Sequence, residues 1–326
     1  MTTTLPPALV LTAGLGTRLA PLTNRLAKPA VPVAGVPLII RLLRWLAAEG
    51  VQTAVLNLHH RPESITRCVG HGSAANLSVR YSWEPVILGT AGGPRRALPL
   101  LDRRFFVING DTLTDLNLRA LLDAHVSSAA AVTLAVMRNP APDRYGGVRV
   151  DKGEWVSGFA GPGAHTLPHF VGVQLVEASV FADLPDGRPA ASIGGVYDTL
   201  LDERPRSVKA HRIAAPFYDV GTPADYLATS LALAAGEGLA SPPPGNRSKI
   251  HPTASLTRTV IWEDVVVEHG CRLVDCVVAD GVRLPHDSVY ERQVITVADD
   301  RSNVVGRRRG DLRLLAFDPH PTPATT

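Results

Sequence analysis

Gly14-Leu15-Gly16-Thr17-Arg18-Leu19-Ala20-Pro21-Leu22-Thr23 follows directly on the short apolar run Ala8-Leu9-Val10-Leu11, and Lys28-Pro29-Ala30 comes soon after. An apolar strand that ends in a glycine-rich turn is typical of an α/β fold that binds phosphate. Residues without a Cβ let the backbone turn sharply and let its N–H groups approach anionic oxygens. Arg18 adds a planar set of donors and Lys28 a mobile cation, and both suit phosphate. The stretch therefore predicts a cradle for a polyphosphate.

Two common phosphate-binding motifs do not fit this stretch. A dinucleotide fingerprint needs a third glycine where Leu19 stands, and a P-loop needs Lys-Ser/Thr after its last glycine. The whole string, from Gly14 to Pro29, instead resembles the signature of the sugar-1-phosphate nucleotidyltransferases, the nucleotide-sugar pyrophosphorylases. The resemblance covers roughly residues 8–235. It implies Arg18 and Lys28 as catalytic residues that hold the leaving pyrophosphate and orient the phosphates.

Composition is that of an ordinary globular protein. The chain has 326 residues, of which 45% are hydrophobic and 19% charged, and length alone favours about two domains. No apolar run is long enough to cross a membrane, the N-terminus lacks the features of a signal peptide, and Cys68, Cys271 and Cys276 form no disulfide framework. We expect a cytoplasmic protein without a membrane partner.

Charge gives little reason to expect a nucleic-acid partner. The formal net charge is +3, and the basic run Arg307-Arg308-Arg309 has no interleaved aromatic residues. We interpret this run as a solvated segment and predict no nucleic-acid binding.

Strand and helix patterns alternate through the first two-thirds of the chain. Strands are expected at 8–11, 53–58, 78–81, 105–109 and 131–136, and helices at 38–46, 62–69 and 116–126. This rhythm predicts an α/β fold, a Rossmann-like and mostly parallel mixed sheet with helices on both faces. From 146 to 217 short strands at 147–150, 155–159, 170–175 and 208–210 suggest an inserted antiparallel layer. A helix is expected at 223–235, with Pro223 in its first turn.

The C-terminal third has a different period. After a proline-rich linker at 236–248, apolar residues recur at six-residue steps through Ile250, Leu256, Ile261, Val267 and Leu273, with one short step before Ile261 and a break after Leu273. Such steps predict a short left-handed β-helix-like domain of two to three coils at 249–292, with a small β-meander as the alternative. We expect the domains 1–235 and 249–292, a C-terminal extension at 293–326 that is disordered after Phe317, and homo-oligomers formed through the C-terminal domain.

Two aspartates are candidate metal ligands. Asp111 follows a buried strand in Asn109-Gly110-Asp111, at the sheet edge where α/β folds bind ligands. Asp219 lies in Tyr218-Asp219-Val220-Gly221-Thr222-Pro223, which resembles the family's second metal-binding motif. Carboxylate oxygens suit Mg²⁺, so Asp111 and Asp219 are the expected Mg²⁺ ligands. The alternative is that each aspartate only orders the turn that follows it.

The resemblance also assigns nucleotide and sugar contacts. A second glycine-rich loop, Gly89-Thr90-Ala91-Gly92-Gly93, matches the family segment that passes the nucleobase, and it looks more like the guanylyl-transferring branch than the thymidylyl one. Asn109 is expected near the ribose or sugar. The full set implied for nucleotide and sugar binding is Leu11, Ala13, Gly14, Gly16, Thr17, Glu84, Gly89, Thr90, Asn109, Tyr145, Gly146 and Gly172.

One departure concerns the sugar side. The family usually carries Glu-Lys-Pro after the strand that corresponds to 155–159, to hold the sugar and its phosphate. This chain has Ala160-Gly161-Pro162-Gly163-Ala164 there. Lys152 and His165 are the nearby residues that could replace the missing side chains.

The reaction implied is Mg²⁺-dependent transfer of a nucleotidyl group from a nucleoside triphosphate to a sugar 1-phosphate, with release of pyrophosphate. The expected substrates are GTP and mannose 1-phosphate or a related sugar 1-phosphate. Uridylyl transfer to an amino-sugar 1-phosphate is the nearest alternative. A third alternative is a non-catalytic paralogue that binds nucleotide sugars and regulates a partner. An acyl-transferring β-helix is disfavoured because the repeat region is short.

Overall fold

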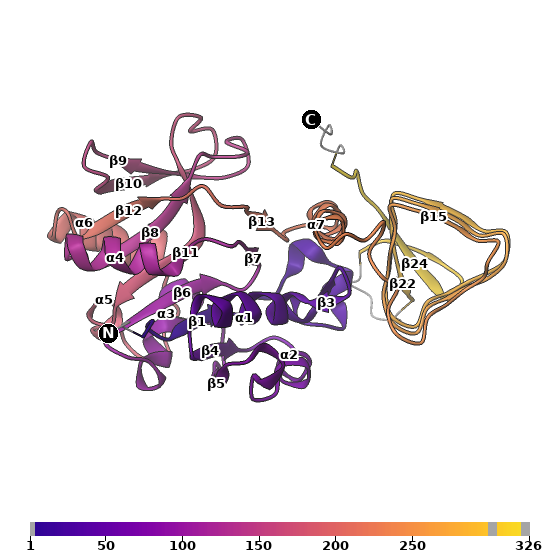
Figure 1. Cartoon of the computed structure of the whole chain (residues 1–326), viewed down its shortest axis with the longest axis horizontal. Coiled ribbons are helices and arrows are strands. Elements are labelled where there is room, and N and C mark those ends of the chain that lie inside the picture. Colours follow the sequence, from indigo (N-terminus) through magenta and orange to yellow (C-terminus); the bar gives the residue numbers. More distant parts are fainter. Residues whose placement is uncertain (1–3, 299–304, 321–326) are drawn as a thin grey trace. The chain divides into compact units, whose positions relative to one another are not determined.

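The computed structural model describes residues 4–298 and 305–320 and divides the chain into two compact units (Figure 1). Unit 1 consists of Met1–Gly14 and Ile39–Phe217, and unit 2 of Leu15–Leu38 and Tyr218–Thr326. From Leu15 onward, the glycine-rich signature segment therefore groups with the C-terminal part of the chain, which the linear division at 235 does not anticipate. The first three residues and the end of the predicted tail, 321–326, lie outside the described residues.

Unit 1 is built on a mixed sheet with the order β12-β8-β11-β6-β1-β4-β5. Parallel pairing joins β1 to β4 and β6, β4 to β5, and β12 to β8, whereas β11 runs antiparallel to β6 and β8. The predicted α/β sheet is confirmed. Its strands are β1 (Ala8–Leu11), β4 (Thr53–Leu58), β5 (Ser78–Trp83), β6 (Arg104–Asn109), β8 (Val132–Met137), β11 (His169–Glu177) and β12 (Val208–Arg212).

The predicted antiparallel layer at 146–217 is wrong for half of its strands. β11 and β12 join the central sheet, and β9 (Gly147–Val150) and β10 (Val156–Ala160) form a separate hairpin. Residues 171–176 of β11 are all buried, as expected for a strand covered on both faces. Short strands bounded by turns look alike in sequence whether they pair with each other or with a distant strand, so the pattern could not separate the two cases.

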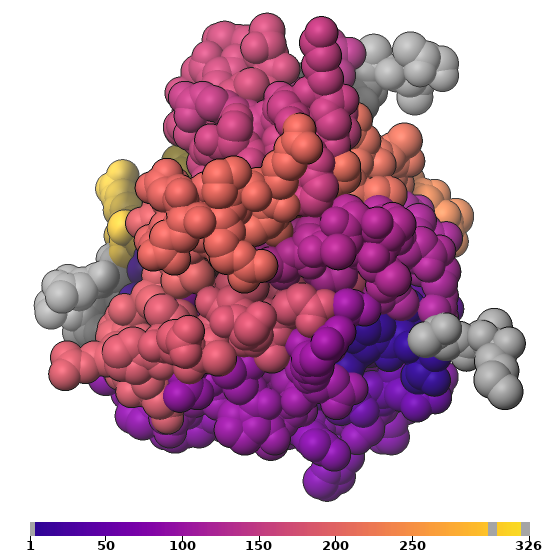
Figure 2. Space-filling model, turned by 90° about the vertical axis from the view of Figure 1, so that its left-hand side faces the viewer, coloured from indigo at the N-terminus to yellow at the C-terminus, as the bar shows by residue number. Residues whose placement is uncertain are grey.

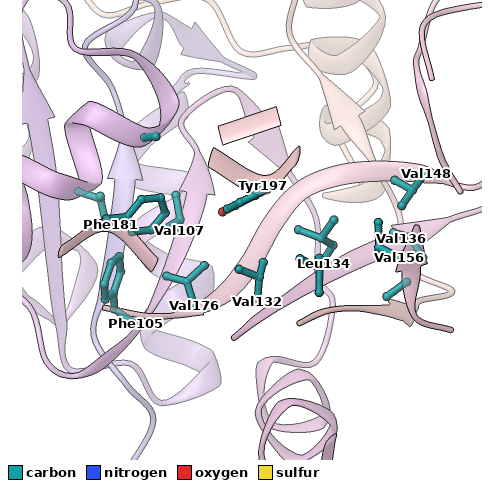
Figure 3. Packing of buried hydrophobic residues seen from close by; sticks show 14 of the residues in the cluster. Phe105, Val107, Val132, Leu134, Val136, Val148, Val156, Val176, Phe181 and Tyr197 are labelled. Atoms are coloured by element: carbon teal, nitrogen blue, oxygen red, sulfur yellow. The ribbon is translucent and has the colours of Figure 1, made fainter. Parts of the chain in front are cut away.

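Helices cover both faces of this sheet. On one face Leu9, Phe105, Val107, Leu134 and Val176 form a buried core with α3, α5 and α6 (Figure 3). On the other face α4 packs on β8, and Glu49 of α1 accepts a hydrogen bond from the Leu118 N–H at the start of α4 (2.8 Å). The helices are α1 (Leu38–Glu49), α2 (Pro62–Val69), α3 (Gly89–Ala97), α4 (Leu118–Ser128), α5 (Ser179–Ala182) and α6 (Tyr197–Glu203).

A buried histidine anchors α4 to the sheet. His125 Nδ1 lies 2.8 Å from Thr133 Oγ1 of β8, and its Nε2 lies 3.3 Å from Glu177 Oε1 of β11. Arg104 also bonds this carboxylate. Burial lowers the pKa of His125 below its ordinary value of 6.5.

Unit 2 contains the predicted coils, seen end on in Figure 1 as a triangle. Lys249 pairs in parallel with Val266 and Val266 with Arg283, so equivalent positions in successive coils are 17 residues apart. Within the described residues, the coil strands form three parallel sheets, consistent with the predicted left-handed β-helix. Their strands are β14 (Lys249–Ile250), β17 (Val266–Val267), β20 (Arg283–Leu284), β15 (Ser255–Thr257), β18 (Arg272–Val274), β21 (Val289–Glu291), β16 (Val260–Ile261), β19 (Val277–Val278) and β22 (Gln293–Val297).

A coil of 17 residues explains the irregular six-residue step. Two sides of each triangle take six residues and the third takes five, so the apolar positions run 250, 256, 261, 267, 273, 278, 284, 290 and 295. From Ile261 onward these positions are all buried. The coils thus extend to β22, where β24 (Leu312–Ala316) and then β23 (Arg307–Arg309) continue the sheet in antiparallel pairing. The arginines of β23 are exposed, as expected for a solvated run.

The signature segment and the helix α7 (Pro223–Gly236) pack on the coils within unit 2. Tyr226 of α7 is buried, donates its hydroxyl hydrogen to the Pro32 carbonyl, and accepts from Trp262 Nε1 (2.8 Å). α7 starts with a capping box, since Thr222 accepts from the Asp225 N–H and Asp225 accepts from the Thr222 N–H. Other short strands are β2 (Pro32–Val33), β3 (Val36–Pro37), β7 (Thr112–Leu113) and β13 (Tyr218–Asp219).

Among the residues that the structure describes, no helix has both the length and the apolar character needed to cross a bilayer.

Candidate active site

The signature loop in unit 2 holds its two cations on a compact scaffold. Gly16 has φ 65°, and a Cβ added there would lie 3.1 Å from the Cβ of Lys28 and 3.0 Å from Thr23 Cγ2. Thr23 donates its hydroxyl hydrogen to the Gly16 carbonyl (3.0 Å). Leu19 is fully buried, whereas Thr17 and Arg18 are exposed. The fold therefore anchors the loop by its apolar side, leaves Arg18 in solvent and brings the backbone of Lys28 beside Gly16.

Unit 1 has a buried glutamate where a nucleotide contact was predicted. Glu84 is 0% exposed; its Oε1 accepts from Asn57 Nδ2 (2.7 Å) and its Oε2 from the Leu88 N–H (2.9 Å). Asn57 in turn accepts from the Thr12 N–H through Oδ1 (2.6 Å). Glu84 thus connects the end of β1, the strand β4 and the start of α3. In unit 1 its carboxylate has a structural role.

The second glycine-rich loop is crowded by the protein itself. A Cβ at Gly89 would lie 2.7 Å from the Ala190 carbonyl oxygen, and one at Gly92 would lie 2.6 Å from that of Arg188. The Ala91 N–H donates to Ala190 (2.9 Å), and Thr90 Oγ1 accepts from the Ser192 N–H (2.8 Å). Its glycines are therefore needed for internal packing against 188–192. Gly89 and Thr90 are nevertheless exposed, so their contact with a base stays a prediction.

Asp111 stands where β6 leaves the sheet. The Gly110 N–H donates to the Leu11 carbonyl at the end of β1 (3.0 Å), and a Cβ at Gly110 would lie 2.5 Å from that oxygen. Gly172, with φ 80°, lies against Asn109 on the other side, since an added Cβ would lie 2.5 Å from Asn109 Nδ2. The structure brings Leu11, Asn109, Asp111 and Gly172 to one edge of the sheet, and Asp111 is half-buried there.

Tyr145 belongs to an aromatic cluster that the sequence did not indicate. Its ring stacks on His169 with centroids 4.5 Å apart and meets Phe217 edge on at 5.9 Å. His169 Nδ1 lies 3.2 Å from the Gly146 carbonyl oxygen. The predicted sugar contacts Tyr145 and Gly146 therefore lie beside an imidazole and a phenyl ring that arrive from distant segments.

The hairpin β9–β10 separates the two candidate replacements for the missing Glu and Lys. Gly147 pairs with Ala160 and Val150 with Val156, so the Asp151–Glu154 turn lies at the far end of the hairpin from Gly146. Lys152 sits in that turn, whereas His165 lies in the loop after Ala160, 3.5 Å from Asp143. In Figures 1 and 2 this hairpin region lies at the upper end of unit 1. Lys152 therefore lies at the end of the hairpin away from Gly146, and its replacement of a missing side chain stays a prediction.

Asp219 closes the short strand β13 in unit 2 and is half-buried, next to the fully buried Val220. The capped start of α7 follows it directly, which fixes the backbone of this carboxylate. Asp111 and Asp219 each offer carboxylate oxygens at an ordered strand end, the donor type that Mg²⁺ prefers. Both residues fit a magnesium ion by donor chemistry.

The residues that the sequence analysis missed mostly join distant segments through hydrogen bonds or ring contacts. Asn57 offered one signal, a polar residue inside the apolar run Val55-Leu56-Asn57-Leu58. Thr12, Ser192, His169 and Phe217 offered none, because their partners are far along the chain.

Comparison with known proteins gives consistent matches. The family model described as "Nucleotidyl transferase" matches residues 7–236. The mannose-1-phosphate guanylyltransferase of Mycobacterium tuberculosis is 32% identical over 297 residues, which cover 87% of this chain and 83% of that protein. The mannose-1-phosphate guanyltransferase of Candida albicans is 30% identical over 227 residues, 67% of this chain and 62% of that protein. Among solved structures, HddC from Yersinia pseudotuberculosis complexed with GMP-PN has a TM-score of 0.60 and 25% identity, covering 70% of this chain and all of that one.

Proposed function

Because this chain belongs to the nucleotidyl transferase family, we propose that it is a guanylyltransferase that joins GTP and a sugar 1-phosphate into a GDP-sugar and pyrophosphate. The observation that carries the proposal is the signature loop, in which Gly16 and Thr23 bring Lys28 against the segment that carries the exposed Arg18. Relatives that match most of the chain are named for guanylyl transfer to mannose 1-phosphate, so mannose 1-phosphate is the first sugar to test.

The reaction needs little acid–base chemistry from side chains. A phosphate oxygen of the sugar 1-phosphate is already anionic and attacks the α-phosphorus of the nucleotide. The bond from that phosphorus to the bridging oxygen of the β-phosphate breaks, and pyrophosphate leaves. Catalysis then rests on positioning and on neutralisation of charge. In the proposal Arg18 stabilises the charge of the leaving pyrophosphate and Lys28 orients the phosphates.

Asp111 and Asp219 are the proposed ligands of the metal ion. When bound, Mg²⁺ neutralises charge on the nucleotide phosphates and helps orient them. Glu84 is proposed to act on the nucleotide indirectly. Its buried carboxylate holds Leu88 and hence the exposed backbone of Gly89 and Thr90. The base is proposed to lie against that exposed backbone.

The sugar side is proposed to use Asn109, Tyr145 and Gly146, together with the aromatic cluster beside Tyr145. His165 lies in the loop after Ala160, near the hairpin end that carries Gly146. A site of this composition would hold a sugar through ring stacking and neutral donors more than through lysine. We propose cytoplasmic action and self-association through the coils as accompanying properties.

The test is pyrophosphate release with Mg²⁺, crossing GTP, UTP, ATP, CTP and dTTP with a panel of sugar 1-phosphates that includes mannose 1-phosphate. The proposal expects turnover with GTP and one or a few sugars. Turnover with UTP alone would move the assignment to uridylyl transfer. Nucleotide binding without pyrophosphate release across the panel would favour the regulatory paralogue.

A further inference from the structure

Two imidazoles and a carboxylate gather at one corner of the C-terminal coils. His269 and His286 occupy equivalent positions in successive coils, and their rings stack with centroids 5.2 Å apart and planes 10° apart. Equivalent positions are close because neighbouring strands of a parallel sheet lie about 4.8 Å apart. Asp287 has one oxygen 3.7 Å from His269 Nδ1 and the other 3.2 Å from His286 Nδ1. One ligand atom of each residue lies within 4.8 Å of the others.

The backbone at this corner is shaped to admit the carboxylate. Gly270 and Asp287 both have positive φ, 69° and 56°, and they lie one coil apart. A Cβ at Gly270 would come within 2.0 Å of Asp287 Oδ1, so the carboxylate fills the space that the glycine opens. The Asp287 N–H donates to the His269 carbonyl (2.9 Å), which fixes the turn. Asp287 therefore leans over the preceding coil, toward His269.

We propose that His269, His286 and Asp287 form a binding site for a divalent transition-metal ion of the zinc type. Ligand atoms about 2.0–2.2 Å from a tetrahedral ion are about 3.4 Å from each other. Each imidazole has one oxygen of Asp287 close to that spacing, Oδ2 at 3.2 Å from His286 Nδ1 and Oδ1 at 3.7 Å from His269 Nδ1, so a small turn of the carboxylate brings one oxygen to both. Imidazole nitrogen with one carboxylate suits zinc, cobalt, nickel or copper, whereas Mg²⁺ prefers oxygen ligands and retains its water.

The exposure of the site fits an ion that enters from solvent. The side chains of His269, His286 and Asp287 are 57%, 70% and 68% exposed. Water would complete the coordination. A bound ion links two successive coils, so it stabilises the folded C-terminal part by an amount that grows with the logarithm of the ratio of ion concentration to Kd. None of these residues belongs to the proposed active site, so their replacement leaves turnover unchanged.

The test uses the full chain without an affinity tag, stripped of metal and kept in excess Mg²⁺. Titration with CoCl₂, followed by visible absorption, and with ZnCl₂, followed by calorimetry, is expected to show a site that His286→Ala weakens at least tenfold. His251→Ala is the matched control. Its ring meets His269 edge on at 5.9 Å, but its Nδ1 is bonded to the Thr253 hydroxyl (2.9 Å), so this variant keeps the wild-type affinity.

A second readout separates binding from damage to the fold. ZnCl₂ is expected to raise the unfolding temperature of the wild-type chain and of His251→Ala, and to leave that of His286→Ala unchanged. Both variants should match the wild type in circular dichroism and in pyrophosphate release without transition metal. Absence of binding in the wild type, or equal zinc affinity in the wild type and His286→Ala, would overturn the proposal.

Discussion

The two glycine-rich loops of this chain look alike in sequence and differ in what surrounds them. In the second loop, Cβ atoms added at Gly89, Gly92 and Gly93 would collide with protein atoms at 2.6–2.8 Å. At Gly14 of the first loop, no described atom of its own unit lies within 4 Å of an added Cβ. Glycine in the second loop serves the packing of the protein. Glycine at position 14 leaves space that a ligand can enter.

A glycine-rich motif can thus serve internal packing or leave space for a ligand. Where glycine serves packing, a substitution should mainly lower stability. Where glycine leaves space for a ligand, a substitution should mainly lower activity. Each variant below is therefore measured in two ways, by urea unfolding followed by circular dichroism and by pyrophosphate release.

Glu84→Ala should have the largest effect on the second loop. It removes a fully buried carboxylate and leaves Asn57 Nδ2 and the Leu88 N–H without their acceptor. We expect the free energy of unfolding to fall by about 4 kcal/mol. Glu63→Ala, at an exposed position of α2, is the control and should change stability little. A loss below about 1 kcal/mol for Glu84→Ala would contradict the structural role of this residue.

Arg18→Ala should have the largest effect on the first loop, and on activity. Loss of a preorganised donor to the leaving group should reduce kcat on the order of 100-fold, about 2.7 kcal/mol. Because Arg18 is exposed, the urea midpoint should not move. Arg25→Ala, an exposed arginine of the same loop outside the predicted site, should keep its turnover. Equal turnover in Arg18→Ala and the wild type would remove Arg18 from the mechanism.

Gly93→Ala should destabilise unit 1. The added Cβ would lie 2.8 Å from Glu84 Oε1 and 3.0 Å from Asn57 Nδ2, both buried and fixed by hydrogen bonds. Overpacking of this kind costs about 2 kcal/mol. Gly236→Ala, where no described atom crowds the added Cβ, provides the control in the same assay. If both variants unfold at the same urea concentration, the crowding is relieved without cost.

Gly14→Ala should show the reverse behaviour. Stability should stay within about 0.5 kcal/mol of the wild type, since the added methyl group meets no described atom of its own unit. Turnover should fall about tenfold, or about 1.4 kcal/mol, because the methyl group occupies the path of the phosphates. A stability loss with unchanged turnover would show that this glycine, like those of the second loop, serves packing.

The smallest effect concerns pH and lies outside both loops. Burial lowers the pKa of His125 below 6.5, so below that pH the unfolded chain takes up a proton that the folded chain resists. The free energy of unfolding is therefore not reduced by protonation of His125 above pH 6.5, and it falls as the pH drops below that value. His125→Gln should flatten this dependence, which urea midpoints at about pH 5.5 and 7.5 would show. An identical pH dependence in the variant would assign it to other groups.

The features that could be predicted from the sequence are those set by interactions between residues close together along the chain. β4, α2 and β9 have the predicted bounds because their apolar periodicity and flanking residues are local. The coils could be predicted from the sequence for a similar reason, since each side of a coil repeats a simple apolar step. The five-residue side, which produces the 17-residue coil, explains the breaks that looked like irregularity.

The rest depended on contacts between distant segments. Nothing local in 188–192 indicates that it packs against the second loop, and nothing in β11 indicates that it enters the central sheet between β6 and β8. Glu84 was predicted to contact the nucleotide, and its carboxylate also lies in a buried network with Asn57. No local pattern indicated this network, because Asn57 is 27 residues away.

The different roles of the two loops are tested most directly by the initial rate of pyrophosphate release from GTP and mannose 1-phosphate with Mg²⁺. This rate is compared between the wild type, Arg18→Ala and Gly93→Ala under conditions where all three are folded. We expect rapid release by the wild type, a loss on the order of 100-fold in Arg18→Ala, and a near wild-type rate in Gly93→Ala. Equal rates in Arg18→Ala and the wild type, with a large loss in Gly93→Ala, would contradict this expectation, because the second loop would then carry the chemistry assigned to the first.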